Sequence, residues 1–150
     1  MKIDCVRLEL VTNHKIEIDL GKKHAYGVES AGKVFAKQIG KSNVENVGLI
    51  CLDSTNRIIN YANIAIGNIE NVKVNIAEIF KIALMSNAAQ IIVGHNHPSG
   101  VLEVTEADVL LTKNIGVVAK IFDIKLLDSI IVNSQEDIIS IRENIFRRKK

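Results

Sequence analysis

Two histidines and an aspartate in the second half of the chain have the residue types and the spacing of a metal site. His95 and His97 flank Asn96 in the run His-Asn-His-Pro-Ser-Gly, and Asp108 lies eleven residues after His97. Three such ligands are one fewer than a closed structural zinc site uses, so one position would stay open for water. Because metal-bound water is a nucleophile at neutral pH, the pattern predicts a hydrolytic zinc centre.

Each half of this pattern also has an ordinary structural interpretation. Thr105 and Asp108 have the Thr-x-x-Asp spacing of a helix capping box, which any helix can use. His95 and His97 would also suit a polar turn that follows a strand. The combination of both halves in a strand-turn-helix context favours the metal site. The remaining histidines lie in polar stretches, and we interpret them as surface residues: His14 and His24.

Other catalytic and cofactor motifs are not found in the sequence. It has no His-Glu-x-x-His helix, no Cys-x-x-Cys after a histidine, no glycine-rich phosphate loop and no Gly-x-Ser-x-Gly elbow. Zincin and zinc-deaminase chemistry are therefore disfavoured. A serine nucleophile of the hydrolase-elbow type is disfavoured as well.

The elements that must position the candidate ligands alternate between strand and helix. Apolar periodicity and turn residues predict strands over residues 47–52, 58–66, 88–94 and 124–132, and helices after Ser30, after Asn75 and from about Thr105 to Lys120. Alternating apolar residues around Thr12-Asn13-His14 predict a β-hairpin over residues 5–19. Residues 136–147 fit either a short strand or a helical tail. This order of elements predicts a layered α/β domain.

The predicted elements bring the candidate ligands to one place. The buried strand ends at His95, and ligands of such sheets bind beyond the carboxyl ends of the strands. His95 and His97 are two residues apart on an extended segment, so their side chains point the same way. Asp108 is the third helical residue if Thr105 is the N-cap. The helix N-terminus then keeps the Asp108 carboxylate ionised and ready to bind a cation.

The composition predicts one domain and gives no support for a nucleic-acid surface. The chain has 150 residues, of which 47% are hydrophobic and 24% are charged, as in ordinary globular proteins. Its net charge is +2, aromatic residues make up 4%, and there is no tryptophan, so direct DNA binding is not supported by the charge. We interpret the basic run Arg147–Lys150 as a solvated tail, with a weak phosphate contact as the alternative.

The cysteines and the apolar runs predict a cytoplasmic protein. Cys5 and Cys51 have no Cys-x-x-Cys spacing, and we interpret both as buried thiols in a reducing compartment. Charged residues interrupt the apolar stretch at the N-terminus, so a signal peptide is not predicted. The longest apolar runs are too short to span a membrane.

The motif His95-x-His97-Pro98, followed by Thr105-x-x-Asp108, resembles the JAMM signature of the JAB/MPN metallopeptidase superfamily. The run His-Asn-His-Pro-Ser-Gly resembles the RadC branch, historically called the DNA repair protein RadC family. The likeness covers roughly residues 29–143, with further matches at residues 44–53, 66–67, 83–89 and 127–132. Departures from the branch are Val101–Val104 in place of Asp-Pro-x-Pro, Ala77 in place of a basic residue, and Ser129 in place of histidine.

The resemblance implies a fold, a cofactor and a domain layout. The fold is a cytidine-deaminase-like layered α/β domain, with a mixed central sheet flanked by helices. Residues 29–150 would form the RadC-type JAB/MPN domain, preceded by an N-terminal β-hairpin extension over residues 1–28. One Zn²⁺ per chain would be held by His95, His97 and Asp108.

The resemblance also implies catalytic roles that spacing does not reveal. Glu45 matches the catalytic glutamate of the superfamily, which takes a proton from water and delivers it to the leaving amine. Read alone, Glu45 is an exposed carboxylate at a strand end. Thr105 matches a serine whose hydroxyl helps to hold the oxyanion of the tetrahedral intermediate. The substrate would be a peptide or an isopeptide-linked protein.

Two other functions stay open at this point. MPN domains also serve as non-catalytic interaction scaffolds, although a scaffold has no need of three ligands and an acid. The name of the family suggests an accessory role in DNA repair or in mobile-element biology. The sequence does not identify the substrate, the native metal or the oligomeric state.

Overall fold

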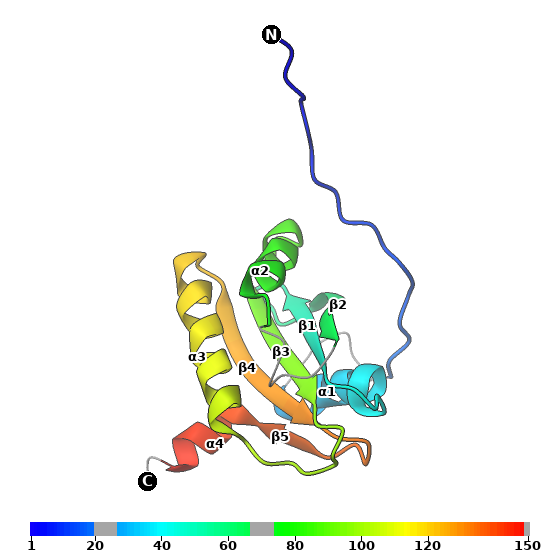
Figure 1. Ribbon diagram of the computed structural model, residues 1–150, viewed down its shortest axis with the longest axis vertical. Coiled ribbons are helices and arrows are strands. Elements are labelled where there is room, and N and C mark those ends of the chain that lie inside the picture. Colours follow the sequence, from blue (N-terminus) through cyan, green and yellow to red (C-terminus); the bar gives the residue numbers. More distant parts are fainter. Residues whose placement is uncertain (20–26, 67–73, 149–150) are drawn as a thin grey trace.

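A five-stranded mixed sheet is the centre of the computed structural model, which describes residues 1–19, 27–66 and 74–148 (Figure 1). Across the sheet the strands are β2 (Ile58–Ile66), β1 (Asn46–Leu52), β3 (Gln90–Asn96), β4 (Lys125–Val132) and β5 (Ile138–Ser140). β3 and β4 are parallel, and the other neighbouring strands are antiparallel. The predicted layered α/β fold with a mixed sheet is confirmed.

Helices cover both faces of the sheet, as the alternation of side chains along the buried strands requires. α2 (Ile76–Met85) and α3 (Glu106–Ile121) pack on one face, against odd-numbered residues of β1 and β3. α1 (Gly27–Phe35) and the π-helical turn η1 (Ala36–Gly40) pack on the other face, mainly against even-numbered residues. Figure 1 shows α3 and α1 on opposite sides of the sheet. The central strands therefore have two covered faces.

The short side chain of Gly94 sets how closely α1 approaches β3. A Cβ atom at this position would come within 2.4 Å of the Phe35 ring. Such a contact is far inside van der Waals distance, so only glycine lets this ring lie on the strand. The Phe35 ring therefore packs on β3 at the residue immediately before His95.

Most predicted elements are present, with shifted ends. The helix predicted to follow Ser30 begins earlier, at Gly27, and Val28 in its first turn packs against the core on that face. The strand predicted to end at His95 continues to Asn96. The ambiguous segment 136–147 contains both alternatives, because β5 leads directly into α4 (Ile141–Arg148).

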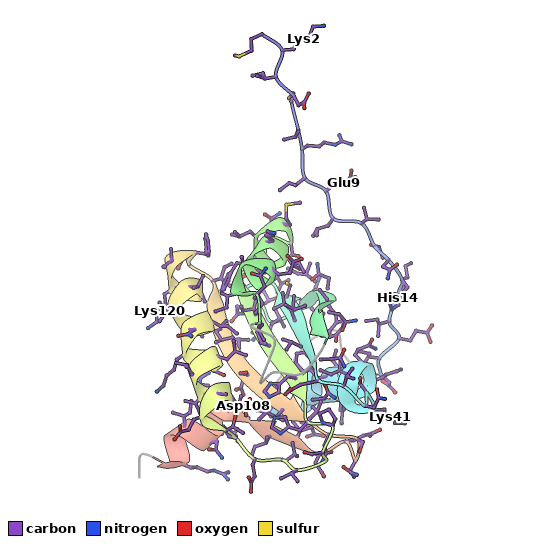
Figure 2. All side chains as sticks on the ribbon, in the orientation of Figure 1. Lys2, Glu9, His14, Lys41, Asp108 and Lys120 are labelled. Atoms are coloured by element: carbon purple, nitrogen blue, oxygen red, sulfur yellow. The ribbon has the colours of Figure 1, made fainter. Side chains whose placement is uncertain are left out.

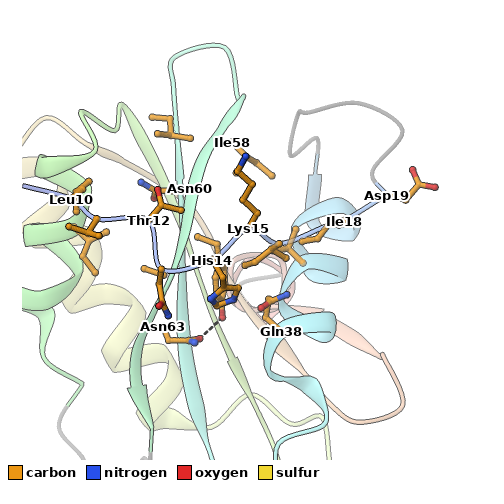
Figure 3. Close-up of a pocket in the computed structure, with 18 residues that line it drawn as sticks. Leu10, Thr12, His14, Lys15, Ile18, Asp19, Gln38, Ile58, Asn60 and Asn63 are labelled. Carbon is orange, nitrogen blue, oxygen red and sulfur yellow. Dashed lines mark hydrogen bonds between the residues drawn. The ribbon is translucent and has the colours of Figure 1, made fainter.

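The β-hairpin predicted over residues 5–19 is wrong. Residues 1–19 contain no strand and run as an extended segment (Figure 1), whose later residues, such as Leu10 and Ile18, line a pocket with β2 and α1 (Figure 3). A hairpin with Thr12-Asn13-His14 as its loop would place Glu9 opposite Glu17, and like charges directly opposite each other destabilise a strand pair. An isolated two-stranded hairpin is marginal even without this repulsion.

The structure also tests the predicted burial of the two cysteines and the predicted exposure of His14. Cys5 is exposed, so its predicted burial is wrong, because the segment that carries it does not pack on the sheet. Cys51 is buried in β1, as predicted. His14 is exposed as predicted, and His24 lies outside the described residues. Among the described residues, no helix has the length and apolarity needed to cross a membrane.

Candidate metal centre

Strand alternation places His95 on the face of the sheet that α3 covers. His95 follows Ile91 and Val93, which belong to the core under α2 and α3, and its side chain is buried. The N-terminus of α3 reaches the same end of β3 and carries Asp108, which Figure 2 labels at that point. The Nε2 atom of His95 lies 3.0 Å from Oδ1 of Asp108. The sheet and α3 therefore bring together two residues that the sequence predicted to share a site.

The His97 ring is oriented by the loop that follows β3. Its backbone N–H donates a hydrogen bond to the Val132 carbonyl at 2.9 Å, which extends the pairing with β4 past the end of the strand. Its Nδ1 lies 3.0 Å from the carbonyl oxygen of Val101. Because a carbonyl only accepts, this contact requires a proton on Nδ1, so Nε2 is the atom through which the neutral imidazole would bind a metal, the arrangement that metal-binding histidines use.

Asp108 is held by a capping box at the start of α3. Its Oδ2 accepts hydrogen bonds from the backbone N–H of Thr105 at 2.9 Å and from the Thr105 hydroxyl at 2.8 Å. The Asp108 N–H donates back to the Thr105 hydroxyl at 3.2 Å. The capping box and the candidate ligand are thus the same residue, with Oδ2 used for the cap and Oδ1 directed at His95.

Asp108 is an anion in this environment at neutral pH. Burial by itself would raise the pKa of the carboxyl group. The hydrogen bond and charge of His95, together with the hydrogen bonds from Thr105, outweigh burial and bring the pKa to about 2. A buried carboxylate that stays ionised beside two imidazoles is suited to bind a divalent cation.

The distances within the cluster fit a single zinc ion. Bonds of about 2.0–2.1 Å at tetrahedral angles would separate neighbouring ligand atoms by roughly 3.3 Å. The two imidazole Nε2 atoms of His95 and His97 are 3.1 Å apart. The Asp108 carboxylate lies 3.0 Å from Nε2 of His95 and 3.8 Å from Nε2 of His97. The donor set and its spacing therefore suit zinc.

Glu45 lies beside the two histidines. Its carboxylate oxygen and the ligand atoms of His95 and His97 all lie within 4.8 Å of one another. Glu45 is half-buried, whereas Asp108 is 2% exposed. The structure thus joins Glu45 to a cluster that is fifty residues away in sequence. Either carboxylate could complete the site, and their different burial favours Asp108 as the ligand.

Asn96 fastens the segment that carries Glu45 to the end of β3, and the sequence analysis did not single it out. Its side-chain oxygen accepts a hydrogen bond from the backbone N–H of Asn46 at 2.7 Å. Its side-chain NH₂ donates to the carbonyl oxygens of Val44 at 3.1 Å and Ser42 at 3.2 Å. The sequence carries no direct signal for this role, because both the burial of the Asn96 amide and its hydrogen-bond partners depend on a segment about fifty residues away.

In this structure the side chain of Thr105 hydrogen-bonds to Asp108. A hydroxyl has one proton, and that of Thr105 is donated to Oδ2 of Asp108. The geometry therefore makes Thr105 a residue that positions Asp108, the candidate ligand. Its expected part in holding an oxyanion stays a prediction.

Taken together, these features define a layered α/β domain with a histidine-carboxylate cluster at the carboxyl end of its central strand. Comparison of the sequence with protein families assigns the domain further. The chain belongs to the RadC-like JAB domain family, whose sequence profile matches residues 26–146.

Curated relatives support this membership. A UPF0758 protein of Finegoldia magna is 39% identical over 118 residues, which is 79% of this chain and 52% of the relative. A UPF0758 protein of Acidithiobacillus ferrooxidans is 40% identical over 99 residues, or 66% of this chain and 44% of the relative. A UPF0758 protein of Xanthomonas campestris is 34% identical over 126 residues, or 83% and 56%. The chain spans about half the length of these relatives.

Proposed function

We propose that this domain is a zinc-dependent hydrolase of amide bonds. The observation that carries the proposal is the convergence of two imidazole nitrogens and one carboxylate, within 3.0–3.8 Å of each other, beside a second, half-buried carboxylate. Two imidazoles and a carboxylate converging at these distances are a donor set that divalent transition metals such as zinc favour. Membership of a JAB domain family supports the same proposal.

His95, His97 and Asp108 would hold the metal. Zinc, when bound, supplies a Lewis acid that polarises a carbonyl group and makes water nucleophilic at neutral pH. The chain prepares these ligands in two ways. Val101 fixes the His97 tautomer that leaves Nε2 free, and Thr105 fixes the carboxylate of Asp108.

Glu45 is the proposed general base. It lies next to the histidines and is partly open to solvent, so its carboxylate can accept a proton from an attacking water. The same carboxyl group can then return the proton to the leaving amine. Asn96 serves this role indirectly, because it ties the backbone on both sides of Glu45 to β3.

We propose a peptide or an isopeptide-linked protein as the substrate. This choice rests on the resemblance of the motif to JAMM metallopeptidases. The chain covers about half the length of its curated relatives. For a longer protein that contains such a domain, this substrate class is therefore a proposal too.

The experiment that tests the proposal compares Glu45→Gln with the wild-type chain on a panel of fluorogenic peptides and isopeptide-linked conjugates, with zinc supplied. We expect Glu45→Gln to lower kcat by about 10²–10⁴-fold, the usual contribution of a general base, and to keep its zinc. Glu143→Gln is the matched control, because Glu143 is exposed on α4, and it should keep full activity.

Two results would contradict the proposal. One is hydrolysis that survives Glu45→Gln and His97→Ala unchanged. The other is a zinc-loaded wild-type chain that cleaves no member of the panel, which would favour the non-catalytic scaffold.

A further inference from the structure

The end of β4 holds the loop that carries His97 at two points. This loop, residues 97–101, follows β3 and lies at the same end of the sheet as the turn between β4 and β5 (Figure 1). At the first point, the His97 N–H donates to the Val132 carbonyl at 2.9 Å. At the second, the side-chain NH₂ of the next residue, Asn133, donates to the Gly100 carbonyl at 3.0 Å. The loop is therefore attached to β4 near both of its ends.

The side chain of Asn133 makes all the hydrogen bonds that an amide can form. Its oxygen accepts from the backbone N–H groups of Gln135 at 3.1 Å and of Asp137 at 2.9 Å. Its NH₂ group donates to the Gly100 carbonyl and, at 3.0 Å, to Oδ2 of Asp137. An amide has two donors and two acceptor positions, so each of them has a partner here. These four bonds hold the buried amide in one orientation.

The Gly100 carbonyl lies one residue before the group that orients the His97 ring. The Gly100 N–H donates to the His97 carbonyl at 3.0 Å and closes a tight turn, and the φ angle of Gly100 is 81°, which favours glycine. The carbonyl of the next residue, Val101, lies 3.0 Å from Nδ1 of His97. Because the peptide group is planar, a bond to the Gly100 carbonyl also fixes the nitrogen of Val101. Asn133 thereby holds the peptide group from which Val101 reaches the ring.

We propose that Asn133 is a positioning residue of the metal centre. It holds the loop so that the Val101 carbonyl meets Nδ1 of His97 and Nε2 stays among the other ligand atoms. It acts through Gly100 and Val101 and makes no bond to the metal itself. Hydrogen-bond partners that orient a metal-binding histidine change the affinity for the metal by about 10–100-fold. This inference rests on the metal centre of the proposed function, and it does not depend on hydrolysis.

An exchange of two side chains isolates the bond to Gly100. Asp137→Asn alone keeps the turn, because an amide oxygen at position 137 accepts from Asn133 as the carboxylate does. Adding Asn133→Asp also keeps the turn, because the new carboxylate accepts from the backbone N–H groups of residues 135 and 137 and from the new amide. A carboxylate has no donor for the Gly100 carbonyl. The single and the double variant therefore differ at the attachment of the loop.

Competition with a chelator measures the zinc affinity of the full chain in each form. Asp137→Asn should bind zinc like the wild type. The double variant should bind it about tenfold more weakly, at the low end of the range for such partners because Asn133 acts through the loop. Ser140→Ala is the control for stability, because it removes hydrogen bonds to Asp128 and Glu143 at the start of α4. It should lower the urea midpoint and leave the zinc affinity unchanged.

Hydrogen exchange of the metal-free chains, measured by NMR, tests the attachment without zinc. The Gly100 N–H should exchange faster in the double variant than in Asp137→Asn, because the turn that it closes loses its support. Amides in the middle of β3, such as that of Val93, should keep their protection in all forms. A residue that only stabilised the fold would change both regions together.

Equal zinc affinities of Asp137→Asn and the double variant would overturn the proposal. So would unchanged exchange at Gly100, or a double variant that loses protection throughout β3 or fails to fold. A wild-type chain that binds no zinc would contradict the metal centre, and this inference would fall with it. If the wild type binds zinc and cleaves no substrate, the proposed function alone is contradicted, and the variants still decide the role of Asn133.

Discussion

The side-chain oxygen of Asn96 accepts a hydrogen bond from the backbone N–H of Asn46 at 2.7 Å, and this contact joins the two halves of the candidate site. Asn96 stands between His95 and His97 in sequence, and Asn46 follows Glu45. Strand alternation turns the histidines toward α3 and turns Asn96 away from them. One run of three residues therefore supplies two candidate ligands and the anchor for the candidate base.

Replacing Asn96 with alanine should damage the site without removing the ligands. The change leaves the buried backbone N–H of Asn46 without its partner and removes the hydrogen bonds to the Ser42 and Val44 carbonyls, so we expect the free energy of unfolding to fall by about 1–3 kcal/mol. We also expect a lower rate of hydrolysis with an unchanged zinc content, because Glu45 loses its anchor. Urea denaturation and elemental analysis measure the two effects. Asn114→Ala removes the same group from an exposed position on α3 and should change neither.

The Thr105 hydroxyl should matter for zinc affinity as well as for stability. Thr105→Val removes the N-cap and the hydrogen bond to Asp108, which should cost about 0.5–2 kcal/mol of stability. Loss of a group that orients a metal ligand weakens binding by about 10–100-fold. Thr105→Ser keeps the hydroxyl and should behave like the wild type. Equal zinc affinities of the valine and serine variants, measured by competition with a chelator, would show that Thr105 does not position Asp108.

The two thiols should differ sharply in reactivity. Cys5 is exposed, whereas Cys51 is fully buried, and burial raises the pKa of the Cys51 thiol to about 11. Because the thiolate is the reactive form, a chromogenic disulfide reagent near pH 8 should titrate one thiol per native chain and two per denatured chain. Cys5→Ser should remove the fast reaction. Rapid titration of two thiols in the native wild-type chain would contradict the described burial of β1.

Local patterns predicted that the candidate ligands lie together, and they predicted the elements that carry them. His95, His97, Thr105 and Asp108 lie within fourteen residues, so strand alternation and a helix cap are enough to make their side chains converge. The positions of β1, β2, β3 and α3 followed from apolar periodicity, which is also a local property of the sequence.

Features that depend on distant segments could not be derived in this way. Glu45 reaches the cluster through the antiparallel pairing of β1 with β3, and only the family resemblance pointed to it. The role of Asn96 required its partners in residues 42–46, which are fifty residues away. Burial of Cys5 was predicted from residue type, but burial depends on whether the surrounding segment packs, and this one does not.

The metal content of the purified chain tests the central claim most directly. Elemental analysis of the wild type should give about one zinc per chain, with loss of the metal in His97→Ala and in Asp108→Ala. Glu45→Gln should keep it, because Glu45 is the proposed base and Asp108 the proposed ligand. A wild-type chain that takes up no zinc at neutral pH, or an Asp108→Ala variant that binds it as well as the wild type, would contradict this account of the site.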